Sequence, residues 1–320
     1  MKKSLIAIMF ALFTIVLAAC GAQDDKKDES NGSKEEQKTI TVKHDYGETK
    51  VPANPKKVVV FDFGTLDTMN KLGIDVTGVP QDNVPSYLKE YKDSKYKNVG
   101  GLKEPDFEAI NEIQPDLIII SGRQADSYDK FSEIAPTIYM GVDTKDYMKS
   151  FESNVKTIGQ IFDKEKQANK ELSAVKDSVQ QLKDKVDPDK KGLIILASGG
   201  KISAYGTQSR FGIIHDEFGV TPSDKNIDSK SPHGQTASFE YVLKQNPDYL
   251  FVVDRDKVVT SEDGKDSGAK KTVENDLVKK TNAYKDGHIV YLDPNYWYLS
   301  GGGLESVAEM VNEVSSAITK

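Results

Sequence analysis

The fold is decided by the stretch FEAINEIQPDLIIISGR, residues 107–123, which aligns without a gap on FEYVLKQNPDYLFVVDR, residues 239–255. In each copy the pattern predicts a short helix that begins near Phe-Glu and ends before Pro-Asp. The helix leads into an apolar, β-branched strand that ends at an arginine. The repeat therefore predicts two similar α/β halves within one chain.

Apolar runs on both sides of the repeat extend this pattern. Buried strands are predicted at residues 58–61, 117–120, 193–196, 249–253 and 289–292. The segments between them are long enough for crossover helices, which predicts parallel α/β layers. Further helices are predicted at residues 213–218, after a turn-rich loop over 201–212, and at residues 304–318.

The middle of the chain, residues 143–186, contains no proline and a single glycine. Apolar residues recur there at helical spacing in two successive runs, so we expect two consecutive helices, the second rich in Lys, Glu and Gln. Such a helix is often an ordinary surface helix. Its place halfway between two similar halves favours a connector.

The first twenty residues predict the compartment. Lys2 and Lys3 precede an uncharged, mostly apolar stretch, and small residues stand before Cys20 in the sequence LAAC. This is typical of a lipoprotein signal over residues 1–19, with Cys20 as the lipidated first residue of the mature chain. A plain signal peptide also ends in small residues, but it gives no reason for the chain's only cysteine to stand there. We therefore expect a protein on the outer face of the cytoplasmic membrane, anchored by acyl chains.

Residues 20–38 comprise the lipidated cysteine and a predicted flexible tether, because residues 21–38 contain no large aliphatic or aromatic side chain. Beyond residue 19 no apolar run approaches the roughly 20 residues that a membrane-spanning helix needs. The net charge of −7 argues against nonspecific nucleic-acid binding, and one cysteine excludes a disulfide framework or a cysteine-based zinc site.

The chain has only three arginines, and all are predicted at strand ends or in loops. Arg123 and Arg255 end the repeated strands, and Arg210 lies in the turn-rich loop. Ligands bind open α/β sheets at the carboxyl ends of the strands, so we expect the three to face one cleft. Planar, permanently charged guanidinium groups would suit a delocalised polyanion.

Two other groups of residues have two interpretations each. Glu108 and Glu240 recur at the start of the repeated helices, where a carboxylate favours the helix dipole, but their recurrence also fits a paired external role. Tyr296, Trp297 and Tyr298 follow a predicted strand and precede three glycines. They would form either a small satellite core or a stacking wall for aromatic rings.

These features together resemble a substrate-binding lipoprotein of an iron-siderophore ABC importer, over residues 39–320. Residues 202–224 are especially similar to the petrobactin- and catecholate-binding branch. The resemblance implies a class III periplasmic-binding-protein-like architecture, α/β, with two Rossmann-like lobes joined by a long helix. We place the N-terminal lobe at residues 39–163, the inter-lobe helix at 164–187 and the C-terminal lobe at 188–320.

The resemblance also implies roles for residues. Arg123, Arg210 and Arg255 match an arginine trio that meets the ferric complex, and Glu108 and Glu240 stand where such receptors meet arginines of the permease. Some members supply a His and a Tyr as iron ligands, for which His233 and Tyr296 or Tyr298 are the candidates. The sequence SPHG around His233 by itself looks like a turn.

We therefore expect a monomeric, non-catalytic receptor without a cofactor that captures a ferric siderophore and delivers it to a permease and its ATPase. Heme or corrinoid binding by the same fold is the main alternative. A zinc or manganese receptor would need clustered ligands, but the four histidines are dispersed. A hydrolase would need a nucleophile, and no G-x-S-x-G elbow occurs.

Overall fold

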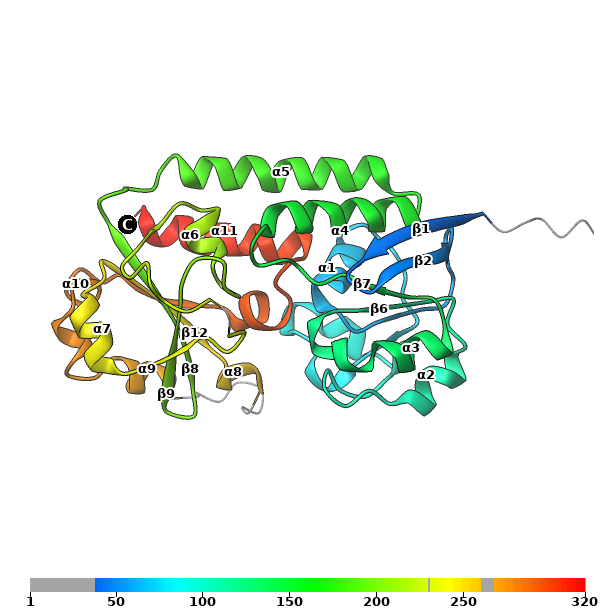
Figure 1. The fold of residues 1–320 in the computed structure, drawn as a ribbon, viewed down its shortest axis with the longest axis horizontal. Helices are drawn as coiled ribbons and strands as arrows, with labels where there is room; N and C mark the ends of the chain where they lie inside the picture. Colours follow the sequence, from blue (N-terminus) through cyan, green and yellow to red (C-terminus); the bar gives the residue numbers. More distant parts are fainter. Residues whose placement is uncertain (1–37, 230, 260–267, 320) are drawn as a thin grey trace, which may run out of the picture. The chain divides into compact units, whose positions relative to one another are not determined.

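The computed structural model describes residues 38–229, 231–259 and 268–319, and its strands form two central sheets and one separate hairpin (Figure 1). The predicted signal peptide and all of the tether except Lys38 lie outside the described residues. Within the described ranges, no helix has the length and apolar character needed to cross a membrane.

The first sheet is parallel throughout, in the order β5-β4-β3-β6-β7. Its strands are β3 (Val58–Val60), β4 (Gly78–Val79), β5 (Lys97–Asn98), β6 (Leu117–Ile120) and β7 (Thr137–Tyr139). The strands predicted at 58–61 and 117–120 are thereby confirmed. Beside this sheet a two-stranded antiparallel hairpin, β1 (Thr39–His44) and β2 (Gly47–Pro52), was not predicted.

The second sheet is mixed, in the order β11-β9-β8-β12-β13, with β10 (Thr221–Pro222) also paired to β8. Strands β8 (Lys191–Ser198), β12 (Tyr249–Asp254) and β13 (Ile289–Leu292) are parallel, whereas β9 (Lys201–Tyr205) is antiparallel to β8, and β11 (Gln235–Ala237) is antiparallel to β9. The prediction of purely parallel layers, and of a loop over 201–205, is therefore wrong here.

The cause is the turn between β8 and β9. Gly199 and Gly200 have φ angles of +58° and +74°, and they make a two-residue connection between Ser198 and Lys201, which pair with each other. Two-residue turns with positive φ at both positions join antiparallel strands, because parallel strands need a crossover of a dozen or more residues.

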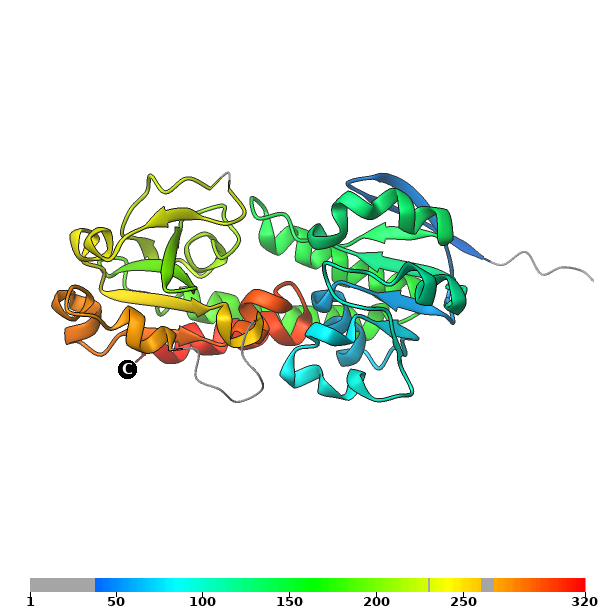
Figure 2. The same ribbon diagram turned by 90° about the horizontal axis from the view of Figure 1, so that it is seen from below.

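Each sheet has helices on both faces (Figures 1 and 2). In β6, Ile118 and Ile120 share a core cluster with Phe131 of α3, whereas Leu117 and Ile119 belong to the cluster on the opposite face, which includes Phe151 of α4. In β12, Leu250 and Val252 likewise pack in a different cluster from Phe251 and Val253. The side chains of a strand alternate between its two faces, so both strands are buried on both sides, as in Rossmann-like folds.

The helices and helical turns are α1 (Phe63–Lys71), η1 (Gln81–Asn83), η2 (Ser86–Lys92), α2 (Phe107–Ile113), η3 (Gly122–Ser127), α3 (Tyr128–Ile134), α4 (Tyr147–Ile161), α5 (Glu165–Lys183), α6 (Ile213–Asp216), α7 (Phe239–Gln245), α8 (Asp256–Val259), α9 (Ala269–Val273), η4 (Val278–Lys280), α10 (Asn282–Lys285), η5 (Asn295–Leu299) and α11 (Leu304–Ile318).

The two helices predicted over 143–186 are α4 and α5. The 19 residues of α5 lead from the first sheet to the second and correspond to about 28 Å of helix. Its buried residues are spaced three or four apart: Ala168, Leu172, Val175, Val179 and Leu182. A Cβ at Gly159 of α4 would come within 2.9 Å of the Ala168 Cβ, so this glycine permits the close packing of α4 on α5.

The repeated segments fold alike in fine detail. Helices α2 and α7 are capped at the start by the side chains of Asp106 and Ser238. Both end at a left-handed residue, Gln114 with φ +50° and Asn246 with φ +42°. Each helix thus stops immediately before Pro-Asp, and β6 and β12 follow with the same geometry.

The aspartates of the two Pro-Asp pairs bind the neighbouring strand in each half. The Asp116 carboxylate accepts the backbone N–H groups of Lys56 and Lys57, both at 2.8 Å. The Asp248 carboxylate accepts the N–H of Lys191 at 2.9 Å. These pairs are therefore more than turn residues, because they fix where β3 and β8 begin.

Candidate functional site

The candidate site is organised by η5, a turn of π-helix that follows β13. Single π-helical turns are rare and are frequent at functional sites. This turn carries Tyr296, Trp297 and Tyr298, which the sequence singled out. Its three aromatic side chains have different surroundings, and only one of them meets the arginines.

Arg123 and Arg210 converge on one backbone oxygen. The Arg123 Nη2 donates to the carbonyl oxygen of Tyr298 at 2.5 Å, and the Arg210 Nη2 donates to the same oxygen at 2.6 Å. Arg123 lies in η3, directly after β6, and Arg210 lies in the segment between β9 and α6. Residues of both halves of the chain therefore meet at a single atom of η5.

Arg255 reaches the other end of the same tyrosine. Its Nε donates to the Tyr298 hydroxyl at 3.0 Å, and its Nη1 donates to the Ser198 Oγ at 3.1 Å. The Arg255 Nη1 also lies 3.6 Å from a carboxylate oxygen of Asp256. The strand ends thus place the three arginines together, as the sequence predicted, although it did not identify Tyr298 as their common partner.

The three guanidinium groups also surround the Tyr298 ring. The Cζ atoms of Arg210, Arg123 and Arg255 lie 4.1, 5.6 and 5.9 Å from the ring centroid. Cations within about 6 Å of an aromatic centroid are attracted to the ring's negative face. One aromatic side chain therefore holds three like charges close together.

The electrostatics of the cluster favour a negatively charged ligand. Burial, and next the charge of Arg210, lower the pKa of Arg123 to about 10, which leaves it protonated at neutral pH. Burial alone would raise the pKa of the Tyr298 phenol, but Arg210 and Arg255 outweigh burial and the net shift is downward. Positive charge is thus concentrated where solvent screens it poorly.

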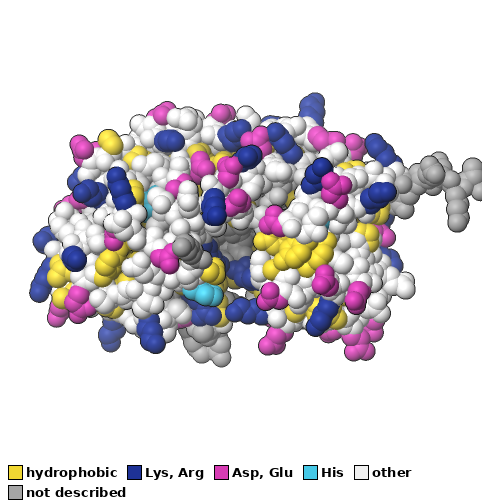
Figure 3. All heavy atoms as spheres, in the orientation of Figure 1, with side chains coloured by type: hydrophobic (Ala, Val, Ile, Leu, Met, Phe, Trp, Pro, Cys, Tyr) yellow, Lys and Arg dark blue, Asp and Glu magenta, His cyan; other side chains and the backbone are white. Residues whose placement is uncertain are grey.

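Figure 3 shows a hollow between the parts of the molecule built on the two sheets, with Lys and Arg side chains inside it. A separate cavity of about 480 Å³ lies between β1, β7 and α4. It is lined by residues such as His44, Tyr139 and Asn154, and none of the predicted site residues contributes to it. We place the candidate site at the arginines, because the convergent charges are there.

Trp297 does not occupy the place predicted for a stacking wall. Its side chain is only 3% exposed, and the indole Nε1 donates to the Glu313 carboxylate at 2.6 Å. The ring is therefore part of the core, which was the other interpretation of this segment. The Tyr296 ring packs on the Tyr87 ring of η2, with the ring centroids 4.6 Å apart, rather than beside Tyr298 among the arginines.

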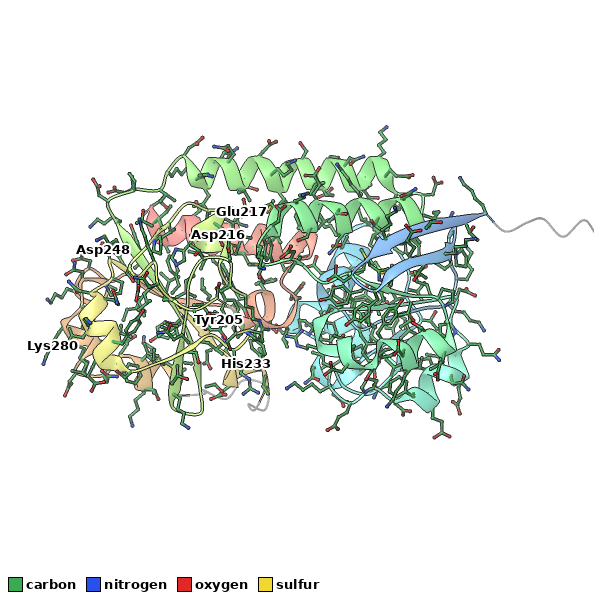
Figure 4. The ribbon with its side chains drawn as sticks, viewed as in Figure 1. Tyr205, Asp216, Glu217, His233, Asp248 and Lys280 are labelled. Carbon is green, nitrogen blue, oxygen red and sulfur yellow. The ribbon has the colours of Figure 1, made fainter. Side chains whose placement is uncertain are left out.

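His233 lies in a turn closed by the Gly234 N–H, which donates to the Ser231 carbonyl at 3.1 Å. Its side chain is exposed, and among the described residues its imidazole has no hydrogen-bond partner. Figure 4 shows His233 at the lower edge of the part built on the second sheet, on the side that faces the first. The structure thus places Tyr298, but not His233, in the arginine cluster. The role of His233 as an iron ligand stays a prediction.

Glu108 and Glu240 are exposed and occupy the second position of α2 and α7. Hydrogen bonds from its own backbone N–H and from Ser238 lower the pKa of Glu240. The two carboxylates thus stand at equivalent places on the two halves. Their position fits either a helix-dipole interaction or a docking contact.

Sequence reasoning missed several residues that shape the site. Ser198, the last residue of β8, accepts a hydrogen bond from Arg255. The Gly-Gly pair that follows Ser198 was the sequence signal that could have pointed to it. The Tyr87 hydroxyl lies 2.8 Å from an Asp67 carboxylate oxygen and 2.7 Å from the Ser300 Oγ, within hydrogen-bond distance of both, which ties η2 to the end of η5. No sequence pattern links residues that are so far apart. Among the described residues, no group of three or more His, Cys, Asp and Glu is arranged to hold a metal ion.

Comparisons with known proteins agree with this architecture. The model of the family described as periplasmic binding protein matches residues 58–296. The chain belongs to this family. It is 52% identical to the petrobactin-binding protein YclQ of Bacillus subtilis (strain 168), with the alignment covering 100% of both chains. The fold is accordingly the class III arrangement of two Rossmann-like lobes joined by a long helix.

Two solved structures are similar over nearly the same span. The crystal structure of the B. subtilis petrobactin-binding protein YclQ has a TM-score of 0.85 and 55% identity, covering 88% of this chain and 99% of that one. The periplasmic catecholate-siderophore binding protein VctP of Vibrio cholerae has a TM-score of 0.82 and 36% identity, covering 87% of this chain and 100% of that one.

Proposed function

We propose that this protein is the extracytoplasmic substrate-binding component of an ABC importer and captures a ferric catecholate siderophore of the petrobactin type. The observation that carries the proposal is the convergence of Arg123, Arg210 and Arg255 on Tyr298. The similarity to a petrobactin-binding and a catecholate-siderophore binding protein supports the same ligand class.

The chemistry of recognition is electrostatic. A ferric tris-catecholate carries about three negative charges, which three guanidinium groups in a poorly screened site would largely offset. In the structure the arginines donate mainly to neutral acceptors, the Tyr298 carbonyl and hydroxyl and the Ser198 Oγ. An anionic oxygen adds Coulomb attraction to the hydrogen bond that a guanidinium makes with a neutral oxygen, so such a ligand would compete well for these donors.

Tyr298 would bind the iron directly if the siderophore leaves coordination positions of the iron unoccupied. A phenol whose pKa is lowered by neighbouring arginines ionises more readily, and a phenolate oxygen is a good ligand for ferric iron. His233, in the exposed turn between β10 and β11, would be the second protein ligand. Iron here is cargo, and the receptor itself has no catalytic role or resident cofactor in this proposal.

The rest of the proposal concerns delivery. Residues 39–163 and 188–320 would act as the two ligand-holding lobes, and Glu108 and Glu240 would meet the permease, whose ATPase drives import. Acyl chains on Cys20 would hold the monomeric receptor at the outer face of the cytoplasmic membrane. A Cys20→Ala variant should then appear in the medium or as unlipidated precursor in a cell fractionation, with no acylated form.

A ligand panel tests the function. The purified chain from residue 38 onward is titrated, by absorbance and intrinsic fluorescence, with ferric petrobactin, a ferric tris-catecholate, a ferric hydroxamate siderophore and heme. The proposal predicts tight binding of the two catecholate complexes and weak binding of the others. Tight binding of heme or of the hydroxamate, with no binding of catecholates, would overturn it.

A further inference from the structure

A partly buried carboxylate holds the turn that carries the candidate site. Glu313 of α11 accepts the Trp297 indole N–H at 2.6 Å and the backbone N–H of Asp293 at 3.0 Å. Asp293 immediately follows β13, and Trp297 lies inside η5. One side chain from a long helix thus binds both the entrance and the interior of the turn.

Contacts within the turn also hold it. The Asp293 carbonyl accepts the backbone N–H groups of Tyr296 and Trp297, both at 3.1 Å. The Asp293 carboxylate accepts the backbone and side-chain N–H groups of Asn295 at 2.9 and 2.8 Å. These bonds shape η5 locally. Contacts from other elements fix it in place: the Glu313 carboxylate, the Ser86 N–H that donates to the Asn295 side chain at 2.9 Å, and the two arginines at the Tyr298 carbonyl.

Desolvation of the Glu313 carboxylate costs free energy, which a purely structural contact would not require. Burial raises the pKa of Glu313, and the nearby Asp293 and Glu309 carboxylates raise it further. Within the described ranges no ion pair compensates the Glu313 carboxylate, and its hydrogen-bond donors are the neutral N–H groups of Asp293 and Trp297. An apolar side chain would leave these two N–H groups without their acceptor, so the partly buried carboxylate points to a positional role.

The neighbouring residue shows what that role would control. Trp297 is buried against the core, and the next residue, Tyr298, presents its carbonyl to Arg123 and Arg210 and its hydroxyl to Arg255. A rotation or shift of the turn that released the indole would therefore also move the only group that all three arginines contact. We propose that Glu313 is a positioning residue that, through Trp297, sets the place of Tyr298 among the three arginines.

The inference rests on the proposed function where it concerns ligand affinity, but its effect on the Tyr298 phenol is independent of any ligand. The variants are Glu313→Ala, which removes both bonds, Trp297→Phe, which removes one donor and keeps an aromatic ring, and Glu313→Gln, whose amide oxygen still accepts the indole N–H. Glu309→Ala is the matched control, because Glu309 lies one turn away on α11 and its carboxylate accepts only the Asn312 amide at 3.3 Å.

Three quantities are measured for each variant. The first is the pKa of the Tyr298 phenol, from the tyrosinate absorbance difference between each variant and the same variant carrying Tyr298→Phe. The second is the dissociation constant for ferric petrobactin, and the third is the urea unfolding midpoint. Glu313→Ala and Trp297→Phe should raise the phenol pKa towards its ordinary value near 10 and weaken binding about tenfold, on the scale of one hydrogen bond to a charged group. Glu313→Gln should lie close to wild type, and Glu309→Ala should match it.

The outcomes separate the two ideas. If Glu313→Ala and Trp297→Phe unfold more easily but keep the wild-type phenol pKa and affinity, Glu313 is only a stabilising residue and the inference is overturned. If the phenol pKa shifts as expected while wild-type protein binds none of the ligand panel, the inference holds and the proposed function is wrong. Should Glu313→Ala fail to fold, Trp297→Phe provides the same test with the packing retained.

Discussion

The two copies of the repeated segment share a scaffold but use it differently. In both, a capped helix ends at a left-handed residue before Pro-Asp, and an arginine follows the buried strand within three residues. After β6 the chain enters η3, and Arg123 binds the backbone carbonyl of Tyr298. After β12 it enters α8, and Arg255 binds the hydroxyl of the same residue. Two equivalent positions thus reach opposite ends of one tyrosine.

The difference shows which parts of the site lie outside the repeat. Arg210 follows β9, the antiparallel strand of the second sheet, and the first sheet has no antiparallel strand. The common acceptor lies in η5, which also stands outside both copies. Duplication accounts for two arginines, whereas the asymmetric additions of the second half make them into one site.

The largest effect is expected where the two copies act together. Replacing both Glu108 and Glu240 by Ala should abolish siderophore-dependent uptake yet leave ligand affinity nearly unchanged, because both carboxylates are exposed on α2 and α7. Uptake of ⁵⁵Fe-loaded siderophore by cells and affinity of the purified variant are the two measurements.

Glu104 and Glu112 provide a control for the double variant. Both are exposed glutamates on either side of Glu108, and replacing them by Ala together changes the charge equally. Wild-type uptake by the Glu108/Glu240 variant would show that these residues are only helix-terminal charges.

The loss of affinity on substitution should be similar for the three arginines, and larger than the loss for a lysine outside the cluster. Replacing Arg123, Arg210 or Arg255 singly by Ala should weaken ferric-catecholate binding by about 1–3 kcal/mol each, the scale of a charge-assisted hydrogen bond. Isothermal titration or fluorescence titration gives the affinities.

Lys149→Ala is the control for long-range charge, since Lys149 is an exposed lysine of α4 whose side chain pairs with Asp146 at 3.2 Å. It should alter the affinity little. If all three arginine variants also bind as wild type does, the anionic-ligand site lies elsewhere.

The aspartates of the Pro-Asp pairs should affect stability rather than binding. Asp116→Ala removes the acceptor of two backbone N–H groups and should lower the free energy of unfolding by about 2 kcal/mol. Asp248→Ala removes the acceptor of one backbone N–H group and of the Asn282 amide, and we expect about 1–2 kcal/mol.

Urea unfolding of each variant gives these values. The Asn substitutions at the same positions keep an acceptor oxygen and should cost less than the Ala substitutions. Equal losses for Asn and Ala would mean that the carboxylate oxygens do not matter and that the turn alone fixes the strands.

Local sequence patterns predicted the repeated helix–strand units, α5 and α11, because each depends on periodicity and end signals within a short segment. The sequence also predicted that the arginines lie together, because ligands of open α/β sheets bind at the carboxyl ends of strands, although the three come from two sheets and Arg210 follows the antiparallel β9. It did not predict their common acceptor, because a backbone carbonyl carries no sequence signature. The burial of Trp297 depends on Glu313, sixteen residues away on another element, and local periodicity does not reveal such a contact.

The smallest predicted effect tests the turn that makes the second half different. Gly199 has φ +58°, and a Cβ there would have no atom within 4 Å, so Gly199→Ala is opposed only by the backbone conformation. An alanine in the left-handed region costs about 1 kcal/mol, which should appear as a lower urea midpoint. Asn tolerates this region better, so Gly199→Asn should lose less. Gly122→Ala in η3 is the matched control, because its φ is ordinary and its Cβ would meet only the Tyr139 hydroxyl at 3.6 Å. If Gly199→Ala is as stable as Gly122→Ala, the hairpin does not require a glycine there, and the antiparallel course of β9 is set instead by its pairing with β8 and β11.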